Sequence, residues 1–162
     1  MIDLAQEGDL WRVTLNRPDK ANAITAAMLQ ELAEIAEAAQ AARAVIITAN
    51  GSVFSGGADL DEMRSGLATS PLWERLSRAI AALPGLSIAA LNGTLAGGAM
   101  GMVLACDIRL AVPATSFFYP VMKRGFLPQP SDSQRMRALI GPARTKLILM
   151  AGQKLTAQQA LQ

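Results

Sequence analysis

The sequence predicts a single α/β domain, and three observations carry this prediction. Short apolar runs that suit buried strands alternate with longer segments of helical periodicity, a pattern typical of a parallel sheet covered by helices. Two of these runs are each followed by a pair of glycines and then by a helix. The 162 residues, 51% of them hydrophobic, fit one domain with a sizeable core.

The N-terminal segment is expected to form a β-hairpin. Ile2–Gln6 and Leu10–Leu15 flank the turn residues Glu7–Asp9, and the second run alternates apolar and polar side chains as a half-buried strand does. A turn at Arg17–Lys20 then leads to Thr25, which is a suitable N-cap.

A strand-helix-strand unit follows the hairpin. The helix that starts after Thr25 is expected to reach about Arg43, with Met28 and Leu32 on its apolar face. Ala44–Thr48 then returns as a strand. Because a helix joins it to the preceding strand, the two strands are expected to run parallel.

In the middle of the chain, after the turn Asn50-Gly51, the sequence pattern predicts two helices. Leu60–Arg64 is a short helix that follows the glycine pair of Phe54–Leu60, and Gly66–Ser70 is expected to be a mobile connection. Ser70 as N-cap, with Pro71 at the first helical position, starts the next helix. Pro84-Gly85 ends it, and the apolar face of this helix carries Leu72, Leu76, Ile80 and Leu83.

The central stretch is read as strand, turn and buried helix. Ser87–Leu91 is an apolar run, and Asn92-Gly93 is a turn dipeptide that can adopt a positive φ. Gly97-Gly98 opens a helix without charge until Asp107. Two further strands are expected after it, at Ile108–Val112 and Ser116–Tyr119.

Two Ser/Thr-x-x-Gln patterns predict helix starts in the C-terminal third, at Ser131–Gln134 and Thr156–Gln159. The first helix is expected to reach Leu139. Gly141-Pro142 should break the chain before a further helix at Ala143–Met150.

The two strand-glycine-helix joints, at Gly56-Gly57 and Gly97-Gly98, indicate a chemical function. Glycines at a helix start leave backbone N–H groups unshielded, and the helix dipole adds partial positive charge there. Two such joints can point two N–H groups at one atom and form an oxyanion hole. Loss of one donor from such a hole typically costs about 3–4 kcal/mol of transition-state stabilisation.

Composition excludes several classes of protein. The net charge of +2 comes from scattered residues, which argues against a nucleic-acid platform. The absence of histidine excludes Ser-His and Cys-His nucleophile pairs and His-based metal sites, and we expect no metal. The lone Cys106 indicates a reducing compartment, which we expect to be the cytoplasm. Acidic residues interrupt any signal-peptide pattern near the N-terminus, no apolar run reaches membrane-spanning length, and no spaced G-x-G-x-x-G or G-K-[ST] loop is present.

Three motifs occur in order at characteristic spacing: Leu15–Ala23 (LNRPDKANA), Phe54–Leu60 (FSGGADL) and Leu91–Asp107 (LNGTLAGGAMGMVLACD). With them, the chain resembles the enoyl-CoA hydratase/isomerase (crotonase) superfamily from about Trp11 to Gln162. The resemblance implies a ClpP/crotonase-like α/β spiral of ββα units. Residues 1–162 would form the core domain without the C-terminal trimerisation helices. Family members usually assemble as trimers or hexamers.

The resemblance also implies an acyl-CoA thioester as the small-molecule partner, with coenzyme A part of the substrate and no separate cofactor. The N–H groups of Ala58 and Gly98 would hold the thioester oxygen as it becomes an enolate. The first loop and the segment after the first glycine pair would lie along CoA. The residues implied in substrate and CoA binding are Lys20, Ala21, Ala58, Asp59, Leu60, Asp61 and Gly98.

The chain departs from the family where hydratases use two glutamates to activate water. Gly101 and Val121 stand at these two positions, and neither can move a proton. Some isomerases have an aspartate at the position of Gln129. We therefore expect isomerase, lyase or decarboxylase chemistry on CoA thioesters, within fatty acid metabolism, rather than hydration. The alternatives are a non-catalytic CoA-binding or structural member of the family and, from another class, a nucleotide-binding module.

Asp132 is the candidate catalytic acid, because it is the nearest acid in the loop that usually lines the pocket. Its other reading is a first-turn helix residue beside a Ser131 cap, favoured by the helix dipole. Tyr119 could reach the pocket as a weak acid or be a core tyrosine with a satisfied hydroxyl. Asp107 is read as structural, and Lys123 and Arg124 as surface charge that could reach CoA phosphates. The apolar residues that suit either an acyl pocket or the core are Met63, Met100, Val121, Met122 and Leu127.

Overall fold

The computed structural model describes every residue from Met1 to Gln162, and its strands form two sheets. The first sheet has five strands in the order β1-β2-β3-β5-β7, parallel except for the hairpin β1-β2. The second has the order β4-β6-β8-β9, with only β9 antiparallel. The strands are β1 (Ile2–Glu7), β2 (Leu10–Leu15), β3 (Ala44–Ala49), β4 (Val53–Ser55), β5 (Leu86–Leu91), β6 (Thr94–Ala96), β7 (Ile108–Ala111), β8 (Ser116–Phe118) and β9 (Leu155–Thr156).

The helices alternate with pairs of strands. Three successive units each place one strand in the large sheet and one in the small sheet before a helix: β3-β4-α3, β5-β6-α4 and β7-β8-α5. This is the predicted spiral of ββα units. The helices are α1 (Ala26–Ala38), α2 (Leu60–Arg64), α3 (Leu72–Ala81), α4 (Met100–Ala105), α5 (Pro130–Leu149) and α6 (Ala157–Leu161), with single 3-10 turns η1 (Pro18–Lys20), η2 (Ala39–Ala41), η3 (Leu67–Thr69), η4 (Gly97–Ala99) and η5 (Met122–Arg124).

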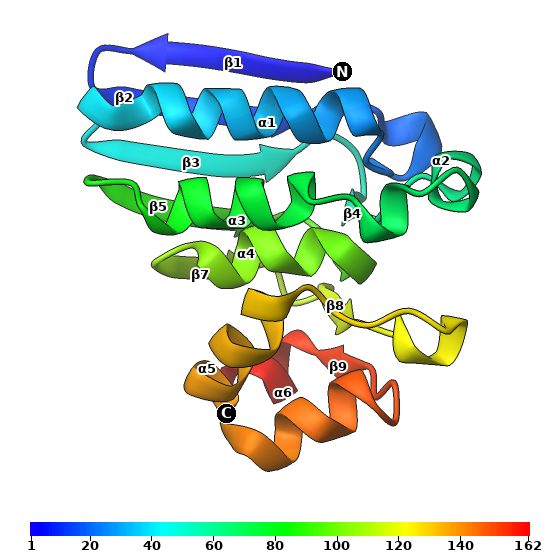
Figure 1. Cartoon of the computed structure of the whole chain (residues 1–162). Helices are drawn as coiled ribbons and strands as arrows, with labels where there is room; N and C mark the ends of the chain where they lie inside the picture. Colours follow the sequence, from blue (N-terminus) through cyan, green and yellow to red (C-terminus); the bar gives the residue numbers. More distant parts are fainter.

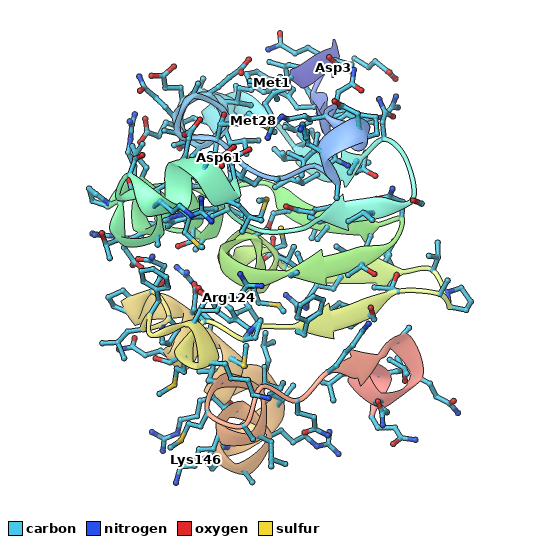
Figure 2. All side chains as sticks on the ribbon, turned by 90° about the vertical axis from the view of Figure 1, so that its right-hand side faces the viewer. Met1, Asp3, Met28, Asp61, Arg124 and Lys146 are labelled. Carbon is cyan, nitrogen blue, oxygen red and sulfur yellow. The ribbon has the colours of Figure 1, made fainter.

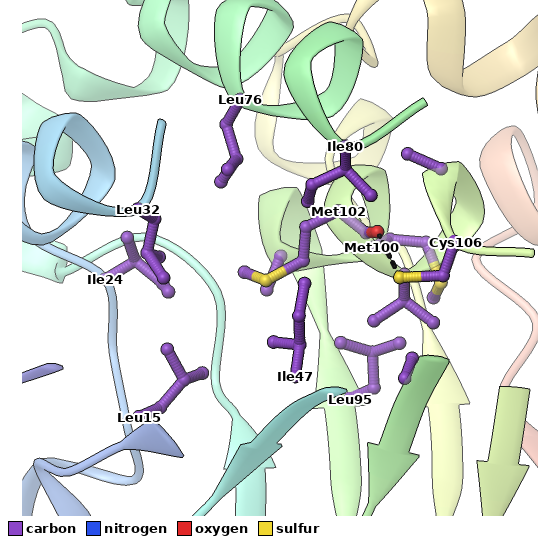
Figure 3. Packing of buried hydrophobic residues seen from close by; sticks show 14 of the residues in the cluster. Leu15, Ile24, Leu32, Ile47, Leu76, Ile80, Leu95, Met100, Met102 and Cys106 are labelled. Atoms are coloured by element: carbon purple, nitrogen blue, oxygen red, sulfur yellow. Dashed lines mark hydrogen bonds between the residues drawn. The ribbon is translucent and has the colours of Figure 1, made fainter. Parts of the chain in front are cut away.

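Figure 1 shows α1, α3 and α4 side by side in one layer against the large sheet, while α5 and α6 lie with β8 and β9 at the other end of the molecule. The core fills the space between the helix layer and the sheet. Leu15 and Ile47 point up from the strands toward Leu32, Leu76 and Ile80 of the helices (Figure 3). Full burial of each such side chain contributes about 1.5–3 kcal/mol to stability. No helix has the length and apolar character needed to span a membrane.

The first helix begins as predicted and ends early. The Thr25 hydroxyl accepts a hydrogen bond from the Met28 N–H at 3.2 Å, which confirms the N-cap. The helix ends at Ala38 and η2 follows, so the prediction that it reaches about Arg43 was wrong. The reason is tertiary, because the N–H of Arg43 donates to the Asp9 carbonyl at 2.9 Å and starts β3 instead.

Two three-residue strands were missing from the sequence prediction. β4 and β6 occupy segments that were read as turn and loop, and they are too short to show the period-2 alternation of a strand. Gly93, beside β6, does not adopt a positive φ. It is required for another reason, because a Cβ there would overlap the carbonyl group of Ser52.

The segment Gly66–Ser70, which was expected to be a mobile connection, has regular local structure. It contains η3, and the buried Leu67 carbonyl accepts a hydrogen bond from the Trp73 indole N–H at 2.8 Å. The helix α3 then begins at Leu72, one residue later than predicted, with Pro71 at its cap position and the Ser70 hydroxyl accepting from the Leu72 N–H.

The start of α5 corrects another prediction. Ser131 is not the N-cap: Gln129 holds that position without a side-chain cap bond, and Pro130 is the first helical residue. The Ser131 hydroxyl instead donates to Glu74 of α3 at 2.8 Å. Gly141, at φ 76° and ψ 168°, kinks α5 at the predicted break. The capping box at Thr156–Gln159 is confirmed.

Candidate active site

The two glycine joints meet at one edge of the small sheet. β4 and β6 are parallel neighbours, with Ser55 opposite Leu95. Because the carboxyl ends of parallel strands lie at the same edge, the segments that follow them, Gly56-Gly57 and Gly97-Gly98, also become neighbours. Strand pairing therefore brings together two loops that are about 40 residues apart in the sequence.

The two loops touch backbone to backbone. Gly57 has a φ of +95°, and a Cβ on it would lie 2.9 Å from the Ala96 carbonyl oxygen. Gly97 has a φ of +59°, and a Cβ there would lie 3.4 Å from the Gly57 Cα. Both positions thus require glycine for the left-handed backbone, and Gly57 also requires it for lack of space. A larger residue would push the two joints apart.

The N–H of Ala58 is held in one direction by its neighbour Ile24. The Ile24 N–H donates to the Gly57 carbonyl at 2.8 Å, and the Ile24 carbonyl accepts from the Asp59 N–H at 2.9 Å. In a parallel bridge of this kind, the central residue's own N–H points to the opposite side. The Ala58 N–H consequently faces away from Ile24 and donates no hydrogen bond within the chain.

The N–H of Gly98 is free for a different reason. Gly98 is the second residue of η4, which leads directly into α4, and the first N–H groups of a helix have no carbonyl within it to donate to. The indole ring of Trp73 packs against this residue, and a Cβ on Gly98 would lie 3.3 Å from two ring carbons. Glycine at 98 therefore lets the indole pack directly against the loop.

Asn22 fixes the first glycine joint from behind. This residue is fully buried, and its side-chain amide donates to the carbonyls of Asn50 at 2.8 Å and Val53 at 2.7 Å. Its own carbonyl accepts from the Ser55 hydroxyl at 2.8 Å, and that hydroxyl accepts from the Gly57 N–H. The buried polar groups are thus satisfied, and the loop is preorganised.

Ala58 and Gly98 line the same cavity, which has a volume of about 90 Å³. Its wall is mostly apolar and contains no carboxylate. Tyr119 and Arg124 are its only residues with titratable side chains. The lining residues are Gly56, Ala58, Leu60, Met63, Ala68, Trp73, Ala96, Gly97, Gly98, Phe118, Tyr119, Pro120, Val121, Arg124, Phe126, Leu127 and Gln129.

The other residues predicted to bind substrate divide into two groups. Leu60 lines the cavity, whereas Asp59 caps α2 and forms a 2.7 Å ion pair with Arg17. The hydrogen bond from Arg17 lowers the pKa of Asp59. Lys20 and Asp61 are exposed and lie outside the cavity wall. Figure 2 shows Asp61 of α2 and Arg124 of η5 on the same side of the molecule.

Ala21 lies behind the first glycine joint, and its carbonyl accepts the Gly56 N–H at 2.8 Å. The loop that carries Lys20 and Ala21 is therefore packed against the segment that presents the Ala58 amide. Sequence reasoning missed the wall residues Trp73 and Phe126, because no local pattern shows which distant side chains will surround a loop.

Asp132 lies in the first turn of α5, as in its alternative reading, but it is fully buried and the neighbouring Ser131 is not the N-cap. The Tyr119 hydroxyl donates to its Oδ2 at 2.6 Å, and its Oδ1 has no hydrogen-bond partner. A Cβ on Gly101 would lie 2.7 Å from that Oδ1. Burial raises the pKa of Asp132 to about 6, against the lowering effects of Tyr119 and Arg135. Asp132 itself does not line the cavity, whereas its hydrogen-bond partner Tyr119 does.

The chain matches the family model described as enoyl-CoA hydratase/isomerase over residues 5–162. The chain belongs to the enoyl-CoA hydratase/isomerase family. It is 36% identical to YngF of Bacillus subtilis over 157 residues, covering 91% of this chain and 60% of YngF. It is 35% identical to the 2,3-dehydroadipyl-CoA hydratase of Escherichia coli, covering 93% of this chain and 61% of that enzyme.

Solved structures agree with this membership. The structure of an enoyl-CoA hydratase from Mycobacterium avium subsp. paratuberculosis superposes with a TM-score of 0.91 at 31% identity, covering 99% of this chain and 67% of that one. The enoyl-CoA hydratase/isomerase fold is thus present. The chain spans about 60–67% of the length of these family relatives.

Proposed function

We propose that the protein binds an acyl-CoA thioester and stabilises its enolate with the N–H groups of Ala58 and Gly98. The observation that carries the proposal is the juxtaposition of two unpaired amides on one apolar cavity. Each amide is oriented by structure behind it, so neither needs to reorganise when charge develops on the substrate oxygen. Preorganised donors of this type contribute roughly 3–4 kcal/mol each to transition-state stabilisation.

The coenzyme A part of the ligand is proposed to lie along the loop that contains Lys20 and Ala21 and along the segment from Ala58 to Asp61. Two observations support this placement. The loop packs against the first glycine joint through the Gly56–Ala21 hydrogen bond, and Lys20 offers an exposed cation beside it. Arg124 adds a second cation in the cavity wall. An ammonium or guanidinium group suits the phosphates of CoA.

The proposed reaction is an isomerisation or a lyase-type cleavage rather than the addition of water. The relatives carry hydratase names, so hydration is the reaction against which the proposal must be tested. What supports the proposal is the absence of any carboxylate from the cavity wall. Gly101 and Val121, at the positions that the family resemblance gives to the two glutamates of hydratases, cannot hold or activate a water.

A second candidate function is the binding of acyl-CoA without its transformation. The same wall favours it, because a binding pocket needs no acid or base and no carboxylate lines the cavity. The two functions share the ligand and differ in chemistry. Both predict affinity for acyl-CoA thioesters, whereas a nucleotide-binding module predicts affinity for free ADP-ribose or NAD.

The test is an acyl-CoA panel in deuterium oxide, followed by mass spectrometry. Enolate formation predicts deuterium at the carbon next to the thioester, with or without a further product. Ala58→Pro removes one amide and should lower the exchange rate about 10²–10³-fold, with Ala58→Gly as the matched control that keeps the N–H. Binding without exchange or product over long incubation would establish the non-catalytic alternative instead.

The assembly and compartment of the whole protein are also proposals. We infer a homotrimer or hexamer in the cytoplasm, active in fatty acid metabolism. Exposed large apolar side chains on β7, α5 and α6, including Leu110, Leu147 and Leu161, support self-association. The single buried thiol of Cys106 suits a reducing compartment. Sedimentation analysis of the purified protein tests the assembly, and a monomer at micromolar concentration would overturn it.

A further inference from the structure

We propose that the Tyr119 hydroxyl carries the proton to and from the substrate carbon, and that Asp132 stores that proton behind it. This inference rests on the proposed enolate chemistry and deepens it, because it assigns the acid-base group that the cavity wall otherwise lacks. Tyr119 would be the catalytic residue that touches the substrate. Asp132 would act through Tyr119 as a positioning and proton-accepting residue.

Tyr119 occupies the one suitable place in the wall. It lines the same cavity as Ala58 and Gly98, and the only other titratable side chain there is the permanently charged guanidinium of Arg124. Tyr119 follows β8, the strand next to β6, so the small sheet fixes it relative to the second glycine joint. Tyr119 is the only lining residue with a hydroxyl group, and no lining residue has a carboxylate.

The tyrosine is connected to a buried acid. Its hydroxyl donates to Asp132 Oδ2 at 2.6 Å, the short separation of a charge-assisted O–H···O⁻ bond. Asp132 is a residue of the first turn of α5, and its side chain has no exposed surface. The Tyr119 oxygen thus connects Asp132 to the cavity in the proposed relay.

The second oxygen of Asp132 is the unusual feature. Oδ1 is buried and has no partner, although unpaired buried carboxylate oxygens are costly and uncommon. It lies against Gly101 of α4, where a Cβ would come within 2.7 Å. The missing side chain at 101 thus creates the space that Asp132 fills. A structural hydrogen bond to Tyr119 would not require one oxygen to remain unsatisfied.

Groups from four elements face Asp132, and only α3 and α5 contribute a charge. Tyr119 approaches from the end of β8, and α4 contributes only the uncharged Gly101. Arg135 of α5 and Glu74 of α3 both bind the Ser131 hydroxyl, at 2.6 Å and 2.8 Å. They act on Asp132 in opposite directions: Arg135 lowers its pKa and Glu74 raises it. Burial is the largest effect and raises the pKas of both Asp132 and Tyr119.

The proposed step balances without another reactant. The C–H bond breaks as its proton moves to the Tyr119 oxygen, while the Tyr119 O–H proton moves to Asp132 Oδ2. The electron pair of the C–H bond forms the enolate, whose charge rests on the thioester oxygen at Ala58 and Gly98. Return of the proton by the reverse path, to the same carbon or to the γ-carbon of an unsaturated acyl chain, regenerates Asp132 as a carboxylate.

One relay that takes and returns a single proton fits isomerisation better than hydration. Moving a double bond requires removal of a proton from one carbon and its delivery to another, with no net uptake of water. Hydration requires in addition a base that activates water, and the wall offers no second group for that task. The substrate class that follows is an enoyl-CoA in which the double bond can move between the α,β and β,γ positions.

The experiment compares wild type, Tyr119→Phe and Asp132→Asn for solvent deuterium exchange and for isomerisation of β,γ-enoyl-CoA thioesters. Asp107→Asn is the matched control, because Asp107 also accepts hydrogen bonds, from the N–H and hydroxyl of Ser87, but lies outside the cavity. Circular dichroism and binding of unreactive acyl-CoA establish that each variant is folded. Tyr119→Phe keeps the ring and is the variant of choice if Asp132→Asn does not fold.

We expect Tyr119→Phe and Asp132→Asn to lower the exchange rate by about 10²-fold or more with little change in acyl-CoA affinity, and Asp107→Asn to leave both unchanged. The wild-type rate should rise with pH to a plateau above about pH 6, where Asp132 is ionised. A loss of activity through structure alone would not remove that pH dependence. If wild type is active and both variants remain as fast, the relay is wrong and the enolate proposal stands; if wild type neither exchanges nor converts any thioester, both are wrong.

Discussion

Substitution of Gly101 by alanine tests whether Asp132 lies where the structure places it. A Cβ at 101 would be 2.7 Å from Oδ1, 3.1 Å from Oδ2 and 3.2 Å from Cγ of Asp132. The carboxyl would have to withdraw by about 0.7 Å to reach ordinary contact, and such overpacking typically costs 1–3 kcal/mol. Its hydrogen bond from Tyr119 at 2.6 Å opposes that movement.

The same substitution has a favourable effect that is independent of Asp132. Gly101 lies within α4, and alanine is better than glycine in a helix interior by about 0.8–1 kcal/mol. The sign of the change therefore depends on the residue at 132. Gly101→Ala should be neutral or destabilising by up to about 2 kcal/mol in wild type, and stabilising by about 1 kcal/mol in Asp132→Ala.

Urea unfolding of the four proteins in this double-mutant cycle gives the coupling free energy, which we expect to be about 2 kcal/mol. The loss of the Tyr119 partner occurs in both Asp132→Ala proteins and cancels from the coupling. Equal stabilisation by Gly101→Ala in both backgrounds, with a coupling near zero, would refute the placement of Asp132 against α4.

Three further predictions concern the pH dependence of stability, the support of the site by Asn22 and the accessibility of the Cys106 thiol. Burial raises the pKa of Asp132 to about 6. The contribution of Asp132 to stability is therefore complete below about pH 4, and about 3 kcal/mol of it is lost as the pH rises through 6. The difference in unfolding free energy between wild type and Asp132→Asn should show this pH dependence, and a constant difference from pH 4 to 7 would contradict it. Asn22→Ala removes the three hydrogen bonds of the buried Asn22 side chain and leaves alanine at a φ of +50°. Calorimetry should therefore show that the free energy of unfolding falls by about 3 kcal/mol. A change below 1 kcal/mol would exclude the role of Asn22 in fixing the first glycine joint. Burial raises the pKa of Cys106 to about 12, so iodoacetamide at pH 8 should label the thiol only after unfolding, and rapid labelling of the native protein would disagree.

The glycine joints could be predicted from the sequence because their signal is local. A glycine pair after an apolar run predicts where backbone N–H groups are unshielded by side chains. In the structure, Ala58 and Gly98 both line one cavity. The N-cap at Thr25 and the capping box at Thr156–Gln159 were predictable for the same reason. In each case the residues that decide the conformation lie within a few positions of one another.

The predictions that were wrong depend on partners far away in the chain. Ser131 has the pattern of an N-cap, but Glu74 of α3, 57 residues earlier, accepts its hydrogen bond and Pro130 starts the helix instead. Asp132 does lie in the first helical turn, but its burial against Gly101 of α4 was not predictable from that position. No spacing rule within one segment reveals such a contact, because it exists only after α3, α4 and α5 have packed.

The pairing of β4 with β6 separates two tasks that many catalytic centres combine. The polarising donors are peptide groups, so they carry no side chain that a point mutation can delete, and their spacing is set by the distance between neighbouring strands. The groups that handle protons arrive from β8 and α5 as replaceable side chains. In a scaffold of this kind, single substitutions among the proton-handling side chains can change the reaction, while the two peptide N–H groups continue to bind the substrate carbonyl oxygen.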